Sequence, residues 1–202
     1  MRIFILRHED RTQDASFFAP LTKNGLDKSI KLIPILNELY ISHIYSSPYI
    51  RTLQTIYPFI KENKKNIKLE YSLSEINDLE LISKNSAGTN LPQYLAESFM
   101  YDPKYNSVIQ PENIKYPETE KDVVNRLKIF LRILITNHIK TDDNILIVSH
   151  QVICGNILKI VNKHLKEKLS REEINNYPVG SLSMIFDHNN WDFKPINWKI
   201  KN

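Results

Sequence analysis

The 202-residue chain contains a single cysteine, Cys154. One thiol cannot form an internal disulfide, so the disulfide-stapled folds of small secreted proteins are excluded and a reducing, cytoplasmic setting is expected. No apolar stretch approaches the roughly 18 residues that a transmembrane helix needs. The short apolar run near the N-terminus ends in charge, unlike a signal peptide. The sequence therefore predicts a soluble protein with no membrane partner.

Glycine is also scarce, with 4 residues in the chain against an average usage of about 7%. Gly25 falls in the first turn of a predicted helix, where glycine is unfavourable, so we expect another segment to approach its backbone closely. The formal net charge of +4 is small. It is compatible with a small anionic substrate and gives no support for nucleic-acid binding.

Apolar strands and amphipathic helices alternate along most of the chain. This pattern is typical of an α/β fold, and we expect a three-layer sandwich with a mostly parallel sheet and helices on both faces. At this length one domain spanning 1–202 is expected. The predicted strands are 3–6, 43–46, 67–71, 144–148 and 181–186, with a final hairpin strand near 191–196. The predicted helices begin near 22, 47, 118 and 151.

The ends of these helices carry recognisable signals. Thr22 is a predicted N-cap, and Thr119 with Asp122 resembles a capping box. Ser47 before Pro48 predicts a helix that starts at the proline with Ser47 as its cap. Pro34 predicts a break in the first helix, and Pro58 a bend or an end in the second.

Between about 77 and 117 the periodicity is lost. This stretch holds Gly88 and four prolines. A structureless loop of that size is unlikely inside a compact domain, so we expect a partly helical, partly irregular insertion over the active site. The adjacent Phe17 and Phe18 lie in another loop, where they either anchor the loop to the core or form part of a pocket wall, and we favour the anchor interpretation.

Three predicted strands end in polar side chains. The carboxyl ends of parallel strands meet at one edge of a sheet, and ligands bind outside that edge. We therefore expect these side chains to form one site. They are Arg7, His8 and Arg11 after the first strand, Ser46, Ser47 and Arg51 after the second, and Ser149 and His150 after the fourth.

These residue types suit a phosphoryl group. Helix N-termini attract anions, and the planar fork of arginine binds phosphate oxygens in pairs. A neutral histidine can attack phosphorus, and a second histidine can stabilise the charge on the equatorial oxygens. The leaving oxygen needs a proton, and Glu75 follows the next predicted strand as a candidate acid.

The spaced motifs also resemble a known family. The chain is similar to the histidine phosphatase superfamily, in the branch that contains cofactor-dependent phosphoglycerate mutase and fructose-2,6-bisphosphatase. The motifs are Leu6-Arg7-His8 with Arg11, Leu21-Thr22-x-x-Gly25, Ser46-Ser47-Pro48-x-x-Arg51, Leu73-x-Glu75 and Val148-Ser149-His150.

This resemblance implies roles for individual residues. It makes His8 the phosphorylated nucleophile and Glu75 the proton donor. Arg7, Arg51 and His150 would complete the phosphate pocket, and Arg11 resembles an additional phosphate-binding arginine. Pro117-Glu118-Thr119 with Arg126 resembles the helix start that follows the insertion. No metal or cofactor is implied.

Three positions depart from the pattern of the family. Glu9 replaces a glycine that usually follows the nucleophilic histidine, and we expect its side chain to turn away from the phosphate pocket toward the loop. Gln151 stands where a glycine commonly follows the second histidine. The usual Gly-rich, Trp-containing stretch after the acid is absent, which leaves Asp78 and Glu80 as alternative acids.

Three functions are compatible with this sequence. The first is a phosphatase that acts on small phosphomonoesters. The second is a mutase that returns the phosphoryl group to its product, which the short chain makes less favoured. The third is a phosphate- or phosphopeptide-binding relative without catalysis, suggested by Glu9. The substrate and the oligomeric state cannot be predicted from the sequence.

Overall fold

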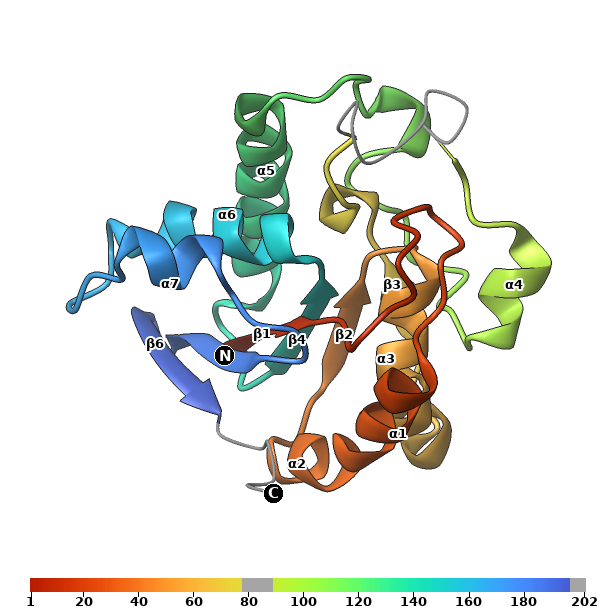
Figure 1. Ribbon diagram of the computed structural model, residues 1–202. Helices are drawn as coiled ribbons and strands as arrows, with labels where there is room; N and C mark the ends of the chain where they lie inside the picture. The colour runs from red at the N-terminus through yellow and green to blue at the C-terminus, as the bar shows by residue number, and fades with distance from the viewer. Residues whose placement is uncertain (78–88, 197–202) are drawn as a thin grey trace.

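The computed structural model describes residues 1–77 and 89–196 (Figure 1). The strands are β1 (Arg2–Arg7), β2 (His43–Ser46), β3 (Ile67–Leu69), β4 (Asn144–Ser149), β5 (Leu182–Asp187) and β6 (Asn190–Ile196). The α-helices are α1 (Lys23–Lys31), α2 (Ile33–Glu38), α3 (Ile50–Asn63), α4 (Gln93–Ser98), α5 (Glu120–His138), α6 (Gln151–Asn162) and α7 (Arg171–Asn175). Two 3₁₀ turns are η1 (Tyr71–Leu73) and η3 (Pro111–Asn113).

All six strands form one sheet in the order β3-β2-β4-β1-β5-β6. The first four in this order pair in parallel, while β5 and β6 extend the sheet as antiparallel strands. Every residue of β4 is buried, as expected for a strand with helices on both sides. The predicted α/β fold with a mostly parallel sheet is confirmed.

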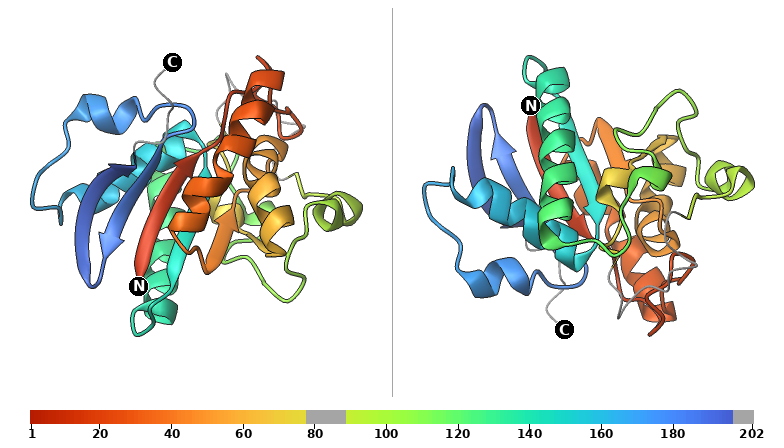
Figure 2. Two further views of the ribbon diagram at one scale, coloured as in Figure 1. Left: turned by 90° about the horizontal axis from the view of Figure 1, so that it is seen from below. Right: turned by 90° about the horizontal axis from the view of Figure 1, so that it is seen from above.

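The alternation of side chains along each strand divides the core into two layers. Phe4 and Leu6 of β1 join the cluster beneath α1, α2 and α3. Ile3 and Ile5 join the opposite cluster, beneath α5, α6 and α7. Figures 1 and 2 show these two groups of helices on opposite faces of the sheet. The three predicted layers are therefore present.

Two predicted helix boundaries differ from the structure. The helix predicted to begin at Pro48 begins at Ile50, with Tyr49 as its N-cap. The Ser47 hydroxyl accepts a long hydrogen bond from the Tyr49 amide at 3.4 Å and lies 2.8 Å from Nε2 of His150, so it is not the N-cap of α3. Pro58 lies inside α3, which continues to Asn63 and ends at Lys64 in the left-handed conformation. By contrast, Thr22 caps α1 as predicted.

The two adjacent phenylalanines have different environments. Phe17 is 3% exposed and packs on Tyr49, with ring centroids 4.7 Å apart. Phe18 is 48% exposed. The anchor prediction is right for Phe17 and wrong for Phe18, because Phe18 remains largely exposed.

The described part of the insertion contains α4 and η3 joined by irregular segments. Figure 1 shows it in green, on the side of the sheet to which the arrowheads of β2 and β4 point. Two tyrosines hold it in place: Tyr71 accepts a hydrogen bond from the Leu91 amide at 2.9 Å, and Tyr105 donates one to Glu70 at 2.5 Å. Asp78 and Glu80 lie outside the described residues.

No helix in the described part of the chain is both long enough and apolar enough to span a bilayer.

At Gly25 the backbone of α1 approaches closely the segment that follows β1. A Cβ atom at this position would lie 2.1 Å from the backbone oxygen of Asp10. The same oxygen accepts a hydrogen bond from the Thr22 amide at 2.9 Å. The expected close approach is therefore confirmed, and it ties the start of α1 to the residues next to His8.

We expect Gly25→Ala to lower the free energy of unfolding by about 1–3 kcal/mol, since the added methyl must displace backbone. Urea denaturation measures this change. Asn24→Ala is the matched control, because Asn24 is an exposed neighbour on the same helix and should stay within about 0.5 kcal/mol of the parent. Equal stabilities for the two variants would contradict the close approach.

Candidate active site

The carboxyl ends of β1, β2 and β4 bring the predicted site residues together. The parallel ladder continues one step past each strand, because the His8 amide donates to Ser149 at 2.9 Å and the Ser47 amide donates to Val148 at 3.0 Å. His150 follows β4 and is the N-cap of α6. The rings of His8 and His150 have centroids 5.3 Å apart. Two histidines from distant parts of the chain thus share one edge.

His8 is 3% exposed, and a backbone contact fixes its tautomer. Its Nδ1 lies 2.7 Å from the carbonyl oxygen of Glu9. Since a carbonyl only accepts, Nδ1 carries the proton and Nε2 keeps its lone pair. Burial, followed by the positive charge of Arg51, lowers the pKa of His8 to about 3. The ring is therefore a neutral base with one free nitrogen near neutral pH.

His150 is fully buried and touches two polar partners. The Nε of Arg51 donates to its Nδ1 at 3.2 Å, and its Nε2 lies 2.8 Å from the Ser47 hydroxyl. An acceptor role for Nδ1 places the proton on Nε2, which donates to Ser47. Burial and the charge of Arg51 lower the pKa of His150 well below its usual value. This ring is also neutral as it stands.

Arg7 and Arg51 supply the positive charge of the site. Arg7 donates from Nη1 to the Tyr177 carbonyl at 2.6 Å, while its buried Nε has no hydrogen-bond partner among the described residues. Arg51 is 1% exposed and lies over the Tyr49 ring, 4.5 Å from its centroid. Burial lowers the pKa of Arg51 to about 10, so it stays charged at neutral pH.

Arg11 has a different environment from the other two arginines. Its Nη1 donates to the backbone oxygens of Thr12, Gln13 and Asp14 within its own loop, at 2.7–2.9 Å. Its charge still contributes to the lowered pKa of His8. In this conformation Arg11 holds its own loop together, because its hydrogen bonds go to that loop rather than to either histidine.

Glu75 reaches the site from the loop after η1. Its Oε2 lies 3.8 Å from Nδ1 of His150, and its side chain is 13% exposed. Burial raises the pKa of Glu75, against the opposing charge of Arg51 and a hydrogen bond from the Ile76 amide. A carboxyl group that holds its proton in this position could act as an acid.

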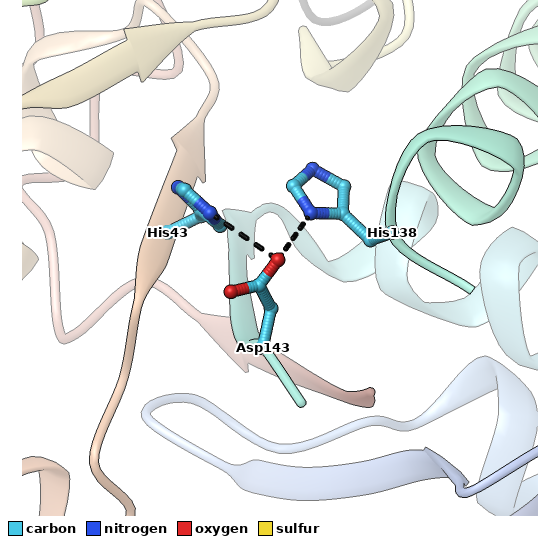
Figure 3. Close-up of side chains that lie close together, drawn as sticks. All are labelled: His43, His138 and Asp143. Carbon is cyan, nitrogen blue, oxygen red and sulfur yellow. Dashed lines mark hydrogen bonds and ion pairs between the residues drawn. The ribbon is translucent and has the colours of Figure 1, made fainter. Parts of the chain in front are cut away.

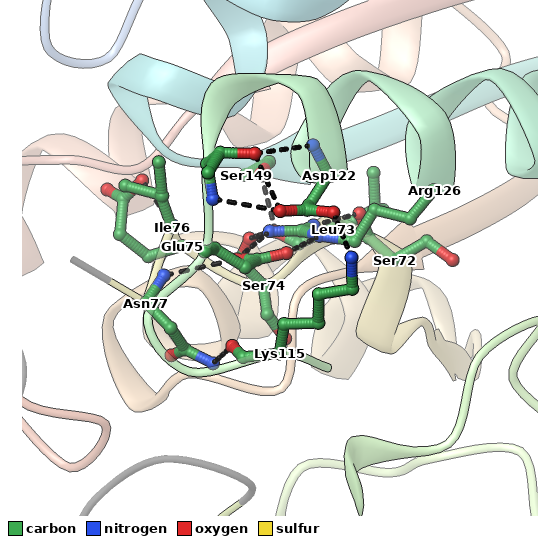
Figure 4. Close-up of polar contacts among 12 residues, drawn as sticks. Ser72, Leu73, Ser74, Glu75, Ile76, Asn77, Lys115, Asp122, Arg126 and Ser149 are labelled. Atoms are coloured by element: carbon green, nitrogen blue, oxygen red, sulfur yellow. Dashed lines mark hydrogen bonds and ion pairs between the residues drawn. The ribbon is translucent and has the colours of Figure 1, made fainter. Parts of the chain in front are cut away.

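A buried ion pair holds the loop that carries Glu75. Arg126 of α5 pairs with Glu118 through Nε at 2.7 Å and Nη2 at 3.0 Å. The same guanidinium donates to the backbone oxygens of Ser72 at 2.5 Å and Ser74 at 2.9 Å. Figure 4 shows this guanidinium beside the segment that directly precedes Glu75. The sequence indicated Arg126 only through its resemblance to the family. Its role in positioning the loop could not be predicted, because that role depends on tertiary contacts with Ser72 and Ser74.

The Glu9 side chain is buried next to a glycine of the loop before β5. A Cβ atom on Gly180 would lie 2.1 Å from Oε1 of Glu9. Gly180 has a φ of +64°, and its amide donates to the His8 carbonyl at 3.1 Å. The Glu9 amide donates to the Thr55 hydroxyl at 3.0 Å. The carboxylate thus occupies space that a side chain at position 180 would need.

A small hollow with about 10 Å³ of space accessible to water lies between this centre and the insertion. Tyr49 connects the two regions, because its ring also packs against His150 with centroids 4.8 Å apart. The lining combines aromatic side chains of the catalytic half with residues of the insertion and its borders. It includes Phe17, Tyr49 and Tyr71 from the former and Asn77, Pro111 and Ile114 from the latter.

The family model of the histidine phosphatase superfamily (branch 1) matches residues 7–199. The chain belongs to the histidine phosphatase superfamily. This confirms the family expected from the spaced motifs of the sequence. No curated protein matches the chain at a significant level of sequence similarity.

Solved structures of other proteins superpose on almost the whole of this chain. The ecdysone phosphate phosphatase of Bombyx mori, in complex with tungstate, has a TM-score of 0.70 at 15% identity and covers 97% of this chain and 92% of its own. The alpha-ribazole phosphatase of Shigella flexneri has a TM-score of 0.64 at 19% identity, with 98% and 96% covered. At these identities the likeness establishes the fold.

A mycobacterial glucosyl-3-phosphoglycerate phosphatase with inorganic phosphate gives a TM-score of 0.61 at 14% identity, with 98% of this chain and 96% of its own covered. The full coverage of both chains indicates that residues 7–199 contain the elements of the superfamily fold without a large deletion.

We expect Arg126→Met to lower the free energy of unfolding by about 3–5 kcal/mol, because it leaves the Glu118 carboxylate buried without its cation. Urea denaturation measures the loss. Lys115→Met is the matched control, since Lys115 pairs with Asp122 near the same helix start but is 69% exposed. That variant should lose at most about 1 kcal/mol. Similar losses for the two variants would contradict the role of the buried pair.

Proposed function

We propose that this chain is a phosphatase that hydrolyses small phosphomonoesters through a phosphohistidine on His8. The observation that carries the proposal is the 2.7 Å contact from Nδ1 of His8 to the Glu9 carbonyl. It directs the lone pair of a buried, neutral imidazole out through Nε2, which is the state that nucleophilic attack on phosphorus requires.

The surrounding residues fit the charge that develops during transfer. Arg51 and Arg7 carry positive charge at the edge where His8 and His150 meet. A dianionic phosphoryl group held there would favour the protonated form of His150, which could then donate to an equatorial oxygen. The N-terminus of α6 begins at Gln151, directly after His150, and adds partial positive charge.

The reaction proceeds in two displacements. Nε2 of His8 forms a bond to phosphorus while the P–O bond to the leaving group breaks, and the leaving oxygen takes the proton of Glu75. Water then attacks the phosphorus and gives a proton to the Glu75 carboxylate. The P–N bond breaks with its electrons returning to Nε2, which restores the neutral histidine and the protonated acid.

The names of the structural neighbours support a small organic phosphate as the substrate class. The structural neighbours are named as phosphatases of small phosphorylated compounds, and two of them are complexes with tungstate or inorganic phosphate. Oxyanion binding in the same fold is consistent with the pocket proposed here.

The non-catalytic binding function is less well supported. Glu75 lies near both His150 and Arg51. A non-catalytic binding protein would not need an acid at this position.

We also propose that 1–202 forms one catalytic domain, since a single sheet includes strands from both ends of the chain. A cytoplasmic location is proposed with it, because the only cysteine, Cys154, is buried and free.

We expect the parent protein to hydrolyse p-nitrophenyl phosphate and His8→Ala to lose at least about 10³-fold in kcat, since the covalent route is removed. Rapid quenching in alkali should trap an acid-labile phosphoprotein in the parent alone. The control is His164→Ala, which removes an exposed histidine. Tight phosphate binding without turnover by the parent would favour the binding relative, and isomerisation of phosphoglycerate in a coupled assay would favour the mutase.

The role of Glu75 is tested by the leaving group. Phenolate needs a proton to depart and p-nitrophenolate does not, so Glu75→Gln should lose about 10²-fold or more in kcat for phenyl phosphate and less than about 10-fold for p-nitrophenyl phosphate.

The pH dependence gives a second test. Because the pKa of Glu75 is raised, kcat for phenyl phosphate should persist at pH values above the usual carboxyl range. It should fall as pH rises through the pKa of Glu75, and Glu75→Gln should lack this decline. The same pattern in Asp78→Asn or Glu80→Gln would assign the acid elsewhere.

A further inference from the structure

A second cluster of histidine and carboxylate side chains lies at the opposite edge of the sheet from His8. His43 is the first residue of β2, and Asp143 directly precedes β4. His138 is the last residue of α5. Figure 3 shows both imidazoles turned toward the Asp143 carboxylate from these three elements. The amino ends of two neighbouring parallel strands and the end of a helix thus meet at one point.

The possible donor atoms of the three residues are close together. Oδ2 of Asp143 lies 2.8 Å from Nδ1 of His138 and 3.5 Å from Nε2 of His43. The three donor atoms all lie within 4.8 Å of one another. Donors about 2.0–2.2 Å from a tetrahedral zinc ion lie roughly 3.4 Å from each other. Side-chain movements that shift these donor atoms by about an ångström would therefore bring them to the geometry of zinc ligands.

Neighbouring residues orient these side chains as ligands require. The hydroxyl of Tyr45 lies 3.1 Å from Nε2 of His138, so that nitrogen has a partner and Nδ1 faces Asp143. The Thr141 hydroxyl donates to Oδ2 of Asp143 at 2.6 Å. Hydrogen bonds of this kind fix the tautomer and the direction of metal-binding side chains.

The cluster is also accessible and has the right charge. The side chains of His43 and Asp143 are 33% and 25% exposed, so an ion can enter and water can complete its coordination. The Asp143 carboxylate supplies a negative charge to a bound cation. Lys68 is the nearby cation, donating to Tyr45 at 3.3 Å.

We propose that His43, His138 and Asp143 bind a divalent transition-metal ion such as Zn²⁺, at a site separate from the catalytic centre. Two imidazoles and one carboxylate suit zinc and its neighbours in the transition series. The ion would join β2, β4 and α5 and so stabilise the fold. This site could not be predicted from the sequence, because His43 is far from the other two residues along the chain and the three residues have no regular ligand spacing.

Calorimetric titration with ZnCl₂ tests the proposal in the His8→Ala background, where the catalytic histidine pair cannot add a second site. We expect one equivalent of Zn²⁺ to bind and to raise the melting temperature. One equivalent of Co²⁺ should give the visible absorption of a low-symmetry, four- or five-coordinate ion rather than that of hexaaqua cobalt.

His43→Ala should weaken zinc binding at least about tenfold and abolish the rise in melting temperature. His43 is the residue of choice because it is the more exposed of the two histidines and its loss should leave the fold intact, which the melting temperature without zinc verifies. His164→Ala is the matched control and should bind zinc like its parent. Absence of stoichiometric binding, or equal affinity in His43→Ala, would overturn the proposal and leave an ion-free Asp143–His138 pair as the anchor of the turn.

Discussion

The parallel pairing of β1 with β4 is the constraint on which the rest of the structure depends. Its register sets Arg7 opposite Ser149, so the next residue of each strand is a histidine. A shift by one residue would turn every side chain of a strand to the other face and exchange the residues of the two cores. The same apolar residues that hold the sheet together therefore also hold His8 and His150 within reach of each other.

Burial at this edge then determines the charge of each group. Removal from water disfavours the charged form, so it lowers the pKa of both histidines and raises that of Glu75. Arg51 adds to the first effect and opposes the second. The result is a neutral base, and a carboxyl group with a raised pKa, beside fixed positive charge, an arrangement that suits the proposed transfer of a phosphoryl dianion.

The sequence predicted the features whose signals are local. The apolar run of β4 and the capping residues Thr22 and Thr119 specify their elements without help from distant residues. Tertiary contacts decided the rest. Ser47 has the sequence of a helix cap, but His150 competes for its hydroxyl. For Glu9 the sequence predicted only a side chain turned toward the loop, since its exact position depends on Gly180, which lies beyond the fourth strand.

Strands β2 and β4 connect the two proposed sites. His43 begins the strand that ends at Ser46, next to the Ser47 partner of His150, and Asp143 precedes the strand that ends at Ser149. A four-residue strand spans roughly 13 Å, and every rung between the two ends is paired. Because that ladder already fixes the carboxyl ends, an ion at the amino ends would add to the cost of separating β2 from β4 while leaving the spacing of the catalytic groups unchanged.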